Sequence, residues 1–61
     1  MIPEYKIGDI VTCHAYAGMT PVTIKGVITD AFRGSCGGWI TVDNAHYLHE
    51  CTIAKIETAA G

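Results

Sequence analysis

The chain has few charged residues, and its cations are fewer than its anions. Charged residues make up 16% of the 61 positions, against about 25% in an ordinary globular domain. The net charge is −2, and the four cations, Lys6, Lys25, Arg33 and Lys55, are scattered along the chain. Nucleic-acid affinity depends on clustered cations that contact phosphates. The composition therefore argues against strong nucleic-acid binding.

Long apolar runs and paired cysteines are also missing. No stretch approaches the roughly 20 apolar residues of a membrane-spanning helix. No basic segment with an apolar run behind it follows Met1, so we expect neither a membrane partner nor a signal peptide. Cys13, Cys36 and Cys51 are an odd number, whereas a secreted disulfide framework favours an even one. We expect three reduced thiols and a cytoplasmic protein.

The residue types that carry metal and catalytic chemistry lack the spacing they need. His46, His49 and Cys51 are close in sequence, but there is no Cys-x-x-Cys pair, and a strand would point the two histidines to opposite faces. A nucleophilic cysteine needs a positive partner, and the neighbours Cys13 and His14 also face opposite ways on a strand. We expect no metal, no cofactor and no catalytic residue, and hence no enzyme.

Glycine is abundant at residues 34–38, yet the pattern is not that of a phosphate-binding loop. Such loops open a helix and carry Gly-Lys-Ser or Gly-Lys-Thr. Here a short apolar segment with β-branched residues, 39–42, follows instead. The stretch therefore predicts a hairpin loop.

Short alternating segments dominate what remains. The small apolar residues Val11, Cys13 and Ala15 alternate with Thr12, His14 and Tyr16, which predicts a strand over residues 11–16. The same reasoning predicts strands at 22–25, 27–32, 39–42, 46–48 and 53–57, a turn at 43–45 and one helical turn at 49–52. Gly26 interrupts the second segment and predicts a bend or bulge there. Val27 and Ile28 are alternatives for the core position after it.

This order of parts resembles SH3-like barrels. The resemblance rests on the opening at residues 6–11, the segment 25–28, the hairpin turn at Asp43 and Asn44, and the closing strand at 53–56. It implies an all-β fold: an SH3-like barrel of about five short antiparallel strands, with one helical turn before the last strand. We expect a single domain spanning residues 1–61.

Two narrower resemblances concern function. Residues 25–28 look like part of the KOW motif of ribosomal and transcription-factor barrels. In length and layout the chain also resembles the type II dihydrofolate reductases, small barrels that assemble around a shared pore. Their Val-Gln-Ile-Tyr stretch corresponds to residues 46–49, but this chain has no glutamine. The resemblance therefore implies self-assembly rather than that chemistry. Small atypical barrels of this kind are also associated with phages and other mobile elements.

The aromatic residues give the best candidates for a binding surface. If Ile40 and Val42 face the core, Trp39 faces outward, and if Leu48 faces the core, Tyr47 faces outward. Exposed aromatics and arginine are the residue types enriched at interaction hot spots. The predicted binding residues are Trp39, Tyr47, Phe32, Arg33 and Tyr16. The alternative for Trp39 is a hydrophobic lid over one end of the barrel.

Three functions follow from these observations. The first is a non-enzymatic protein-interaction module that self-associates, because apolar residues reach 49% and few charges cover them. The second is a weak nucleic-acid-binding barrel in which aromatic rings stack on bases. The third, a small oligomeric enzyme with a shared pore, requires Tyr47 and His49 to converge at an interface.

Overall fold

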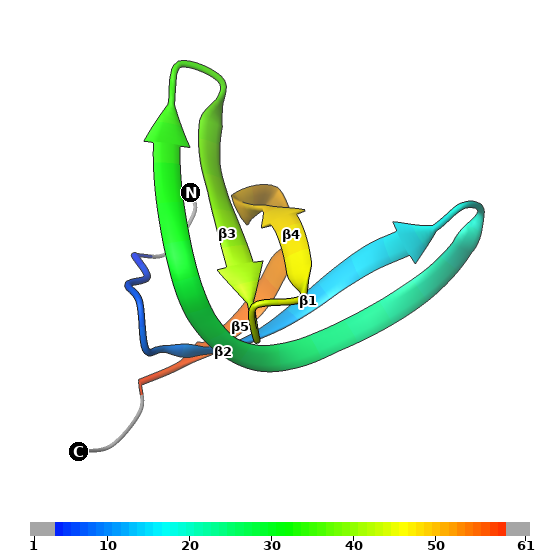
Figure 1. The fold of residues 1–61 in the computed structure, drawn as a ribbon. Helices are drawn as coiled ribbons and strands as arrows, with labels where there is room; N and C mark the ends of the chain where they lie inside the picture. Colours follow the sequence, from blue (N-terminus) through cyan, green and yellow to red (C-terminus); the bar gives the residue numbers. More distant parts are fainter. Residues whose placement is uncertain (1–3, 59–61) are drawn as a thin grey trace.

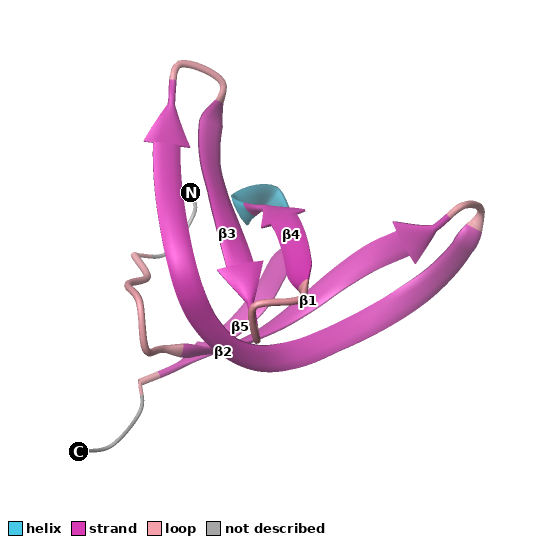
Figure 2. Ribbon diagram, in the orientation of Figure 1, coloured by secondary structure: helices cyan, strands magenta, loops and turns pink. Residues whose placement is uncertain are grey.

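The computed structural model describes residues 4–58, which form one antiparallel sheet of five strands (Figure 1). The strands are β1 (Ile10–Ala17), β2 (Thr20–Gly34), β3 (Gly37–Val42), β4 (His46–His49) and β5 (Ile53–Glu57). A single turn of 3-10 helix, η1 (Glu50–Thr52), precedes β5 (Figure 2). The all-β class, the antiparallel strands and the helical turn before the last strand are confirmed.

Strand β2 is the element that both halves of the sheet share. It has 15 residues, and the strand order is β4-β3-β2-β1-β5. Its first part pairs with β1 and its second part with β3. In Figure 1, β2 curves strongly, so that its hairpin with β1 and its hairpin with β3 point in different directions.

The sheet of the described residues does not close, which corrects the expected barrel. Strands β4 and β5 are the two ends of the strand order. They follow each other in the chain, but η1 lies between them and no ladder joins them in residues 4–58. The fold is therefore an open sheet, bent on itself at β2.

The core lies on the concave side of this bend. Its fully buried members are Val11, Cys13, Ile28, Ile40 and Val42. Alternation along β1 and β3 places the four members on these strands inward, as the sequence predicts. Of the two alternatives after Gly26, Ile28 is the core residue, while Val27 is 39% exposed.

The change of side-chain direction in β2 occurs after Ile28 and not at Gly26. The register between β2 and β3 shifts between Ile28 and Asp30, which leaves Thr29 as an extra residue, a β-bulge. Beyond the bulge, Ala31 pairs with the buried Ile40. Beyond the bulge, the odd-numbered residues of β2 therefore face the core. Before the bulge, the even-numbered residues face it.

Side-chain hydrogen bonds support the bulge. The Thr29 hydroxyl donates to the carbonyl of Thr41 at 3.2 Å and accepts the N–H of Asn44 at 3.0 Å. These bonds link the extra residue of β2 to the end of β3 and to the turn that follows it. The bulge is thus tied to the β3–β4 turn by one side chain.

The predicted turn at residues 43–45 is confirmed. Asp43 and Asn44 have φ angles of 53° and 55°, a left-handed conformation that Asp and Asn tolerate better than most residues. The Asp43 carboxylate accepts the N–H of Val27 at 3.0 Å. This brings the carboxylate against Gly26, where a Cβ would collide with Asp43 Oδ2 and lie 2.7 Å from Val42 Cγ1.

The predicted hairpin loop at residues 34–38 is shorter in the structure, and the connection between β1 and β2 is equally short. The β1–β2 connection is a tight turn at residues 18–19, and the β2–β3 connection is a tight turn at 35–36. Pro21 lies within β2 opposite Tyr16. Proline has no backbone N–H to donate to a second neighbouring strand. None is needed at this position, because β2 pairs with β3 only from Ile28 onward.

Gly26→Ala tests this close approach. We expect the substitution to lower the free energy of unfolding by about 1–3 kcal/mol, because the added methyl group has no room beside Asp43 and Val42. Urea denaturation measures the loss. The matched control is Gly34→Ala, whose Cβ would meet only the ring of Phe32, at 3.1 Å. This ring is exposed and free to turn aside. Equal stability of the two variants would contradict the steric role of Gly26.

Candidate functional site

Four ring side chains gather on the outward face of β2, β3 and β4, and we call them the aromatic surface: Phe32, Trp39, Tyr47 and His49. Phe32 lies opposite Trp39, and Trp39 lies opposite His49. Residues directly opposite in an antiparallel pair share a face. The Trp39 and Tyr47 rings stack with centroids 5.0 Å apart and planes 6° apart. His49 meets Trp39 edge-on at 4.8 Å.

The aromatic surface faces away from the core. Phe32 and Tyr47 are each 65% exposed, and Trp39 is half-buried. The neighbours of Trp39 in β3, Gly38 and Ile40, are buried on the other side. The expected outward direction of Trp39 and Tyr47 is confirmed. Trp39 does not act as a lid over the core, because the bent sheet separates its ring from the buried cluster.

His49 is fixed by hydrogen bonds at both ring nitrogens. Its Nε2 lies 3.1 Å from the carbonyl of Cys36, and its Nδ1 lies 3.1 Å from the N–H of Cys51. A carbonyl only accepts and a backbone N–H only donates, so the ring proton belongs on Nε2. Both nitrogens are occupied, which leaves neither for a metal. Within residues 4–58, no three His, Cys, Asp or Glu side chains form a group that could hold one.

Arg33 lies on the opposite side of the sheet from the aromatic surface, in a polar cluster with Tyr5 and Glu50. The Tyr5 hydroxyl donates to Glu50 Oε1 at 2.6 Å, and Arg33 donates to the same oxygen at 3.2 Å. The guanidinium also lies 5.8 Å from the centre of the Tyr5 ring. A Cβ at Gly38 would collide with the Tyr5 hydroxyl and the Glu50 carboxylate. Gly38 therefore makes room for the cluster.

The contacts within this cluster shift the pKa values of Glu50 and Tyr5 in opposite directions. The Tyr5 hydroxyl, the backbone N–H of Gly38 and the Arg33 charge hold the pKa of Glu50 below its ordinary value. Burial, together with the Glu50 carboxylate, raises the pKa of Tyr5. Glu50 is therefore ionised and Tyr5 protonated at neutral pH. This arrangement joins the N-terminal segment to η1.

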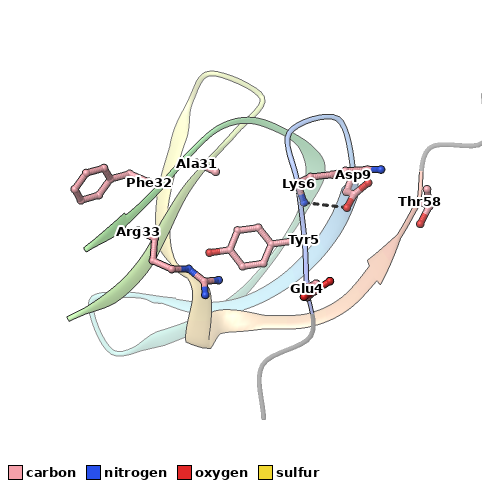
Figure 3. A pocket seen from close by; sticks show the side chains of 8 residues that line it. All are labelled: Glu4, Tyr5, Lys6, Asp9, Ala31, Phe32, Arg33 and Thr58. Carbon is pink, nitrogen blue, oxygen red and sulfur yellow. Dashed lines mark hydrogen bonds between the residues drawn. The ribbon is translucent and has the colours of Figure 1, made fainter. Parts of the chain in front are cut away.

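A pocket of about 640 Å³ lies beside the polar cluster. Its lining residues come from the N-terminal segment, β2 and the position after β5: Glu4, Tyr5, Lys6, Asp9, Ala31, Phe32, Arg33 and Thr58. Figure 3 shows Arg33 turned toward Tyr5 while the Phe32 ring points away from it. Asp9 accepts the backbone N–H of Lys6 at 3.1 Å. Asp9 and Arg33 are thus already engaged within the chain.

The remaining predicted site residues lie elsewhere. Tyr16 is 73% exposed near the far end of the β1–β2 hairpin, which points away from β3 and β4 (Figure 1). It is not part of the aromatic surface, and its binding role stays a separate prediction. All three cysteines are free. Burial raises the pKa of the Cys13 thiol, whereas Cys36 and Cys51 are exposed.

The polar cluster is the feature that the sequence did not reveal. Tyr5 and Glu50 are separated by 45 positions, and Arg33 and Glu50 by 17. No local spacing links them. The only signal was the adjacent pair Gly37 and Gly38 at the start of a strand, since glycine in a strand often marks a close approach.

Comparison with protein-family models, with curated proteins and with solved structures found no match to this chain. Among residues 4–58, no helix has the length and apolar character needed to cross a membrane.

The polar cluster predicts a specific pH dependence. The pKa of Glu50 lies below its ordinary value of 4.5 in the folded chain. Its stabilising effect is therefore complete above about pH 4.5 and is lost as the pH falls through the lower folded-state pKa. We expect urea midpoints between pH 7 and pH 3 to fall more steeply for the native chain than for Glu50→Gln.

Two further variants control this measurement. Tyr5→Phe removes one donor to Glu50 and should lower the free energy of unfolding by about 1–2 kcal/mol. Glu57→Gln removes a carboxylate whose pKa is lowered by Lys55, in a pair that is largely exposed. It should change the acid dependence less than Glu50→Gln does. An unchanged pH profile in Glu50→Gln would show that the cluster does not stabilise the fold.

Proposed function

We propose that this protein is a non-enzymatic interaction module that self-associates through the aromatic surface of β2, β3 and β4. The observation that carries the proposal is the pre-formed stack of Trp39 and Tyr47 beside the exposed Phe32. Aromatic side chains are the commonest anchors of protein interfaces. Here Trp39 and Tyr47 are already stacked on each other, so these two rings lose little side-chain freedom when a partner covers them.

The distribution of charge supports a protein partner over nucleic acid. Arg33 is paired with Glu50, and Lys55 is paired with Glu57. Half of the four cations are thus engaged within the chain and do not face the aromatic surface. A base stacked on Trp39 would have few cations nearby to contact its phosphate.

The compartment is part of the same proposal. Cys36 and Cys51 are exposed and unpaired, and exposed free thiols persist in a reducing compartment. This supports a cytoplasmic protein.

Sedimentation velocity over a concentration series from about 10 µM to about 1 mM tests self-association. We expect the native chain to form dimers or larger assemblies as concentration rises. Replacing both Phe32 and Tyr47 with Ser should shift the chain to the monomer, because it removes the two most exposed rings of the aromatic surface.

Tyr16→Ser is the matched control, since Tyr16 is an equally exposed aromatic on the other hairpin. It should leave the association unchanged. A monomer at every concentration would contradict the proposal, and so would a loss confined to Tyr16→Ser. Binding of a labelled single-stranded oligonucleotide at low salt, abolished by the same Phe32 and Tyr47 substitutions, would favour the nucleic-acid alternative instead.

A further inference from the structure

An acidic side chain, Asp30, lies on the same outward face as the aromatic surface. Asp30 is opposite Thr41 of β3, and Thr41 is opposite Tyr47 of β4. The next pair on this face, two positions along each strand, is Phe32 with Trp39. Asp30 is therefore a diagonal neighbour of Trp39. Such neighbours are about 7–8 Å apart, a spacing that long side chains bridge.

The Asp30 carboxylate has no cationic partner within residues 4–58. Asp30 is exposed, and its Oδ1 accepts the backbone N–H of Ala31 at 2.9 Å. The two ion pairs of the described chain are made by Glu50 and Glu57. Arg33, the cation nearest to Asp30 in sequence, points to the other side of the sheet, toward Glu50. The outward face thus presents an unpaired negative charge beside its aromatic rings.

The rings leave the space between Asp30 and Trp39 open. Tyr47 covers one face of the Trp39 indole, and among the described residues no second ring stacks on the other face. The Phe32 ring lies over Gly34, since a Cβ at that glycine would be 3.1 Å from it. Gly34 follows Phe32 in the strand and Asp30 precedes it. The Phe32 ring therefore leans away from Asp30.

We propose that the aromatic surface and Asp30 together bind an arginine side chain of a partner protein. A guanidinium is flat and cationic, so it stacks on an indole ring such as that of Trp39. The N–H groups at its edge can donate to the Asp30 carboxylate at the same time. This inference rests on the aromatic surface being an interface, as in the proposed function. It names a partner other than a second copy, because the one arginine of this chain, Arg33, is held by Glu50.

The combination of an indole and a carboxylate favours arginine over other charged ligands. A lysine ammonium is a compact point charge, which neither stacks flat on a ring nor forms two parallel hydrogen bonds to a carboxylate. A nucleic acid would bring its phosphates toward Asp30, which has the same sign of charge. Charge complementarity and shape therefore select the same ligand.

A nuclear magnetic resonance titration with short peptides tests the ligand. The probe is acetyl-Gly-Arg-Gly-amide, in which arginine carries the only charge. It is added to ¹⁵N-labelled native chain at low chain concentration, where a second copy competes least for the surface. We expect shifts of the indole N–H of Trp39, the single tryptophan, and of the backbone N–H groups of Asp30 and Phe32.

Two related peptides separate charge from shape at matched ionic strength. Citrulline is as flat as arginine but uncharged, and its peptide should bind at least about fivefold more weakly. The lysine peptide keeps the charge but loses the flat group, and should bind about twofold to threefold more weakly. These comparisons use the native chain and do not depend on a variant that folds.

Asp30→Asn tests the carboxylate itself. The asparagine oxygen can still accept the N–H of Ala31, so the sheet should keep its stability in urea. We expect affinity for the arginine peptide to fall about threefold to fivefold. The matched control Glu57→Gln also removes one negative charge, but on β5, at the far end of the strand order. It should change the affinity less than about 1.5-fold.

The outcomes separate this inference from the proposed function. Equal affinity for the arginine and citrulline peptides, or equal weakening by the two variants, would overturn the arginine site. A chain that self-associates through the aromatic surface but does not bind the arginine peptide would overturn it and leave the proposed function standing. Arginine binding by a chain that stays monomeric would support the site and contradict self-association. Oligonucleotide binding at the same residues, without arginine binding, would favour the nucleic-acid alternative and overturn the site.

Discussion

The extra residue in β2 is the constraint on which the rest of the structure depends. Thr29 changes which face of the strand its later residues occupy. With uninterrupted alternation, Phe32 would point inward with Ile28, and Arg33 would point outward. The bulge reverses both directions. It places Phe32 beside Trp39 on the aromatic surface and brings Arg33 to the buried carboxylate of Glu50.

The same bulge links the two halves of the sheet. Because β2 serves both hairpins, it must bend, and a bulge increases local bending and twist. The Thr29 hydroxyl is bonded to β3 and to the following turn. The Asp43 carboxylate of that turn reaches back to β2 at Val27. The bend is thus held from both sides, and Gly26 supplies the space that the Asp43 carboxylate needs.

Local patterns predicted the strands well and long-range geometry poorly. Alternation at Val11, Cys13, Ile40 and Val42 identified core positions, because side-chain direction follows directly from the pleat. The bulge was expected at Gly26, the obvious irregular residue, but it lies at Thr29, since strand register is set by pairing with β3. The bond between Tyr5 and Glu50 joins residues 45 positions apart, and no periodic signal reports such a contact.

The aromatic surface has a structural role that is separable from binding. Strand β4 has only four residues, and the stack of Trp39 on Tyr47 is a cross-strand contact that stabilises its pairing with β3. A ring that only stabilised the pairing of β4 with β3 would need no contact beyond its stack on Trp39. Tyr47 nevertheless keeps 65% of its surface exposed. Loss of Tyr47 should therefore affect both the fold and the proposed self-association. A loss of association on replacing Tyr47 is therefore evidence for the aromatic surface as an interface only where the free energy of unfolding is retained.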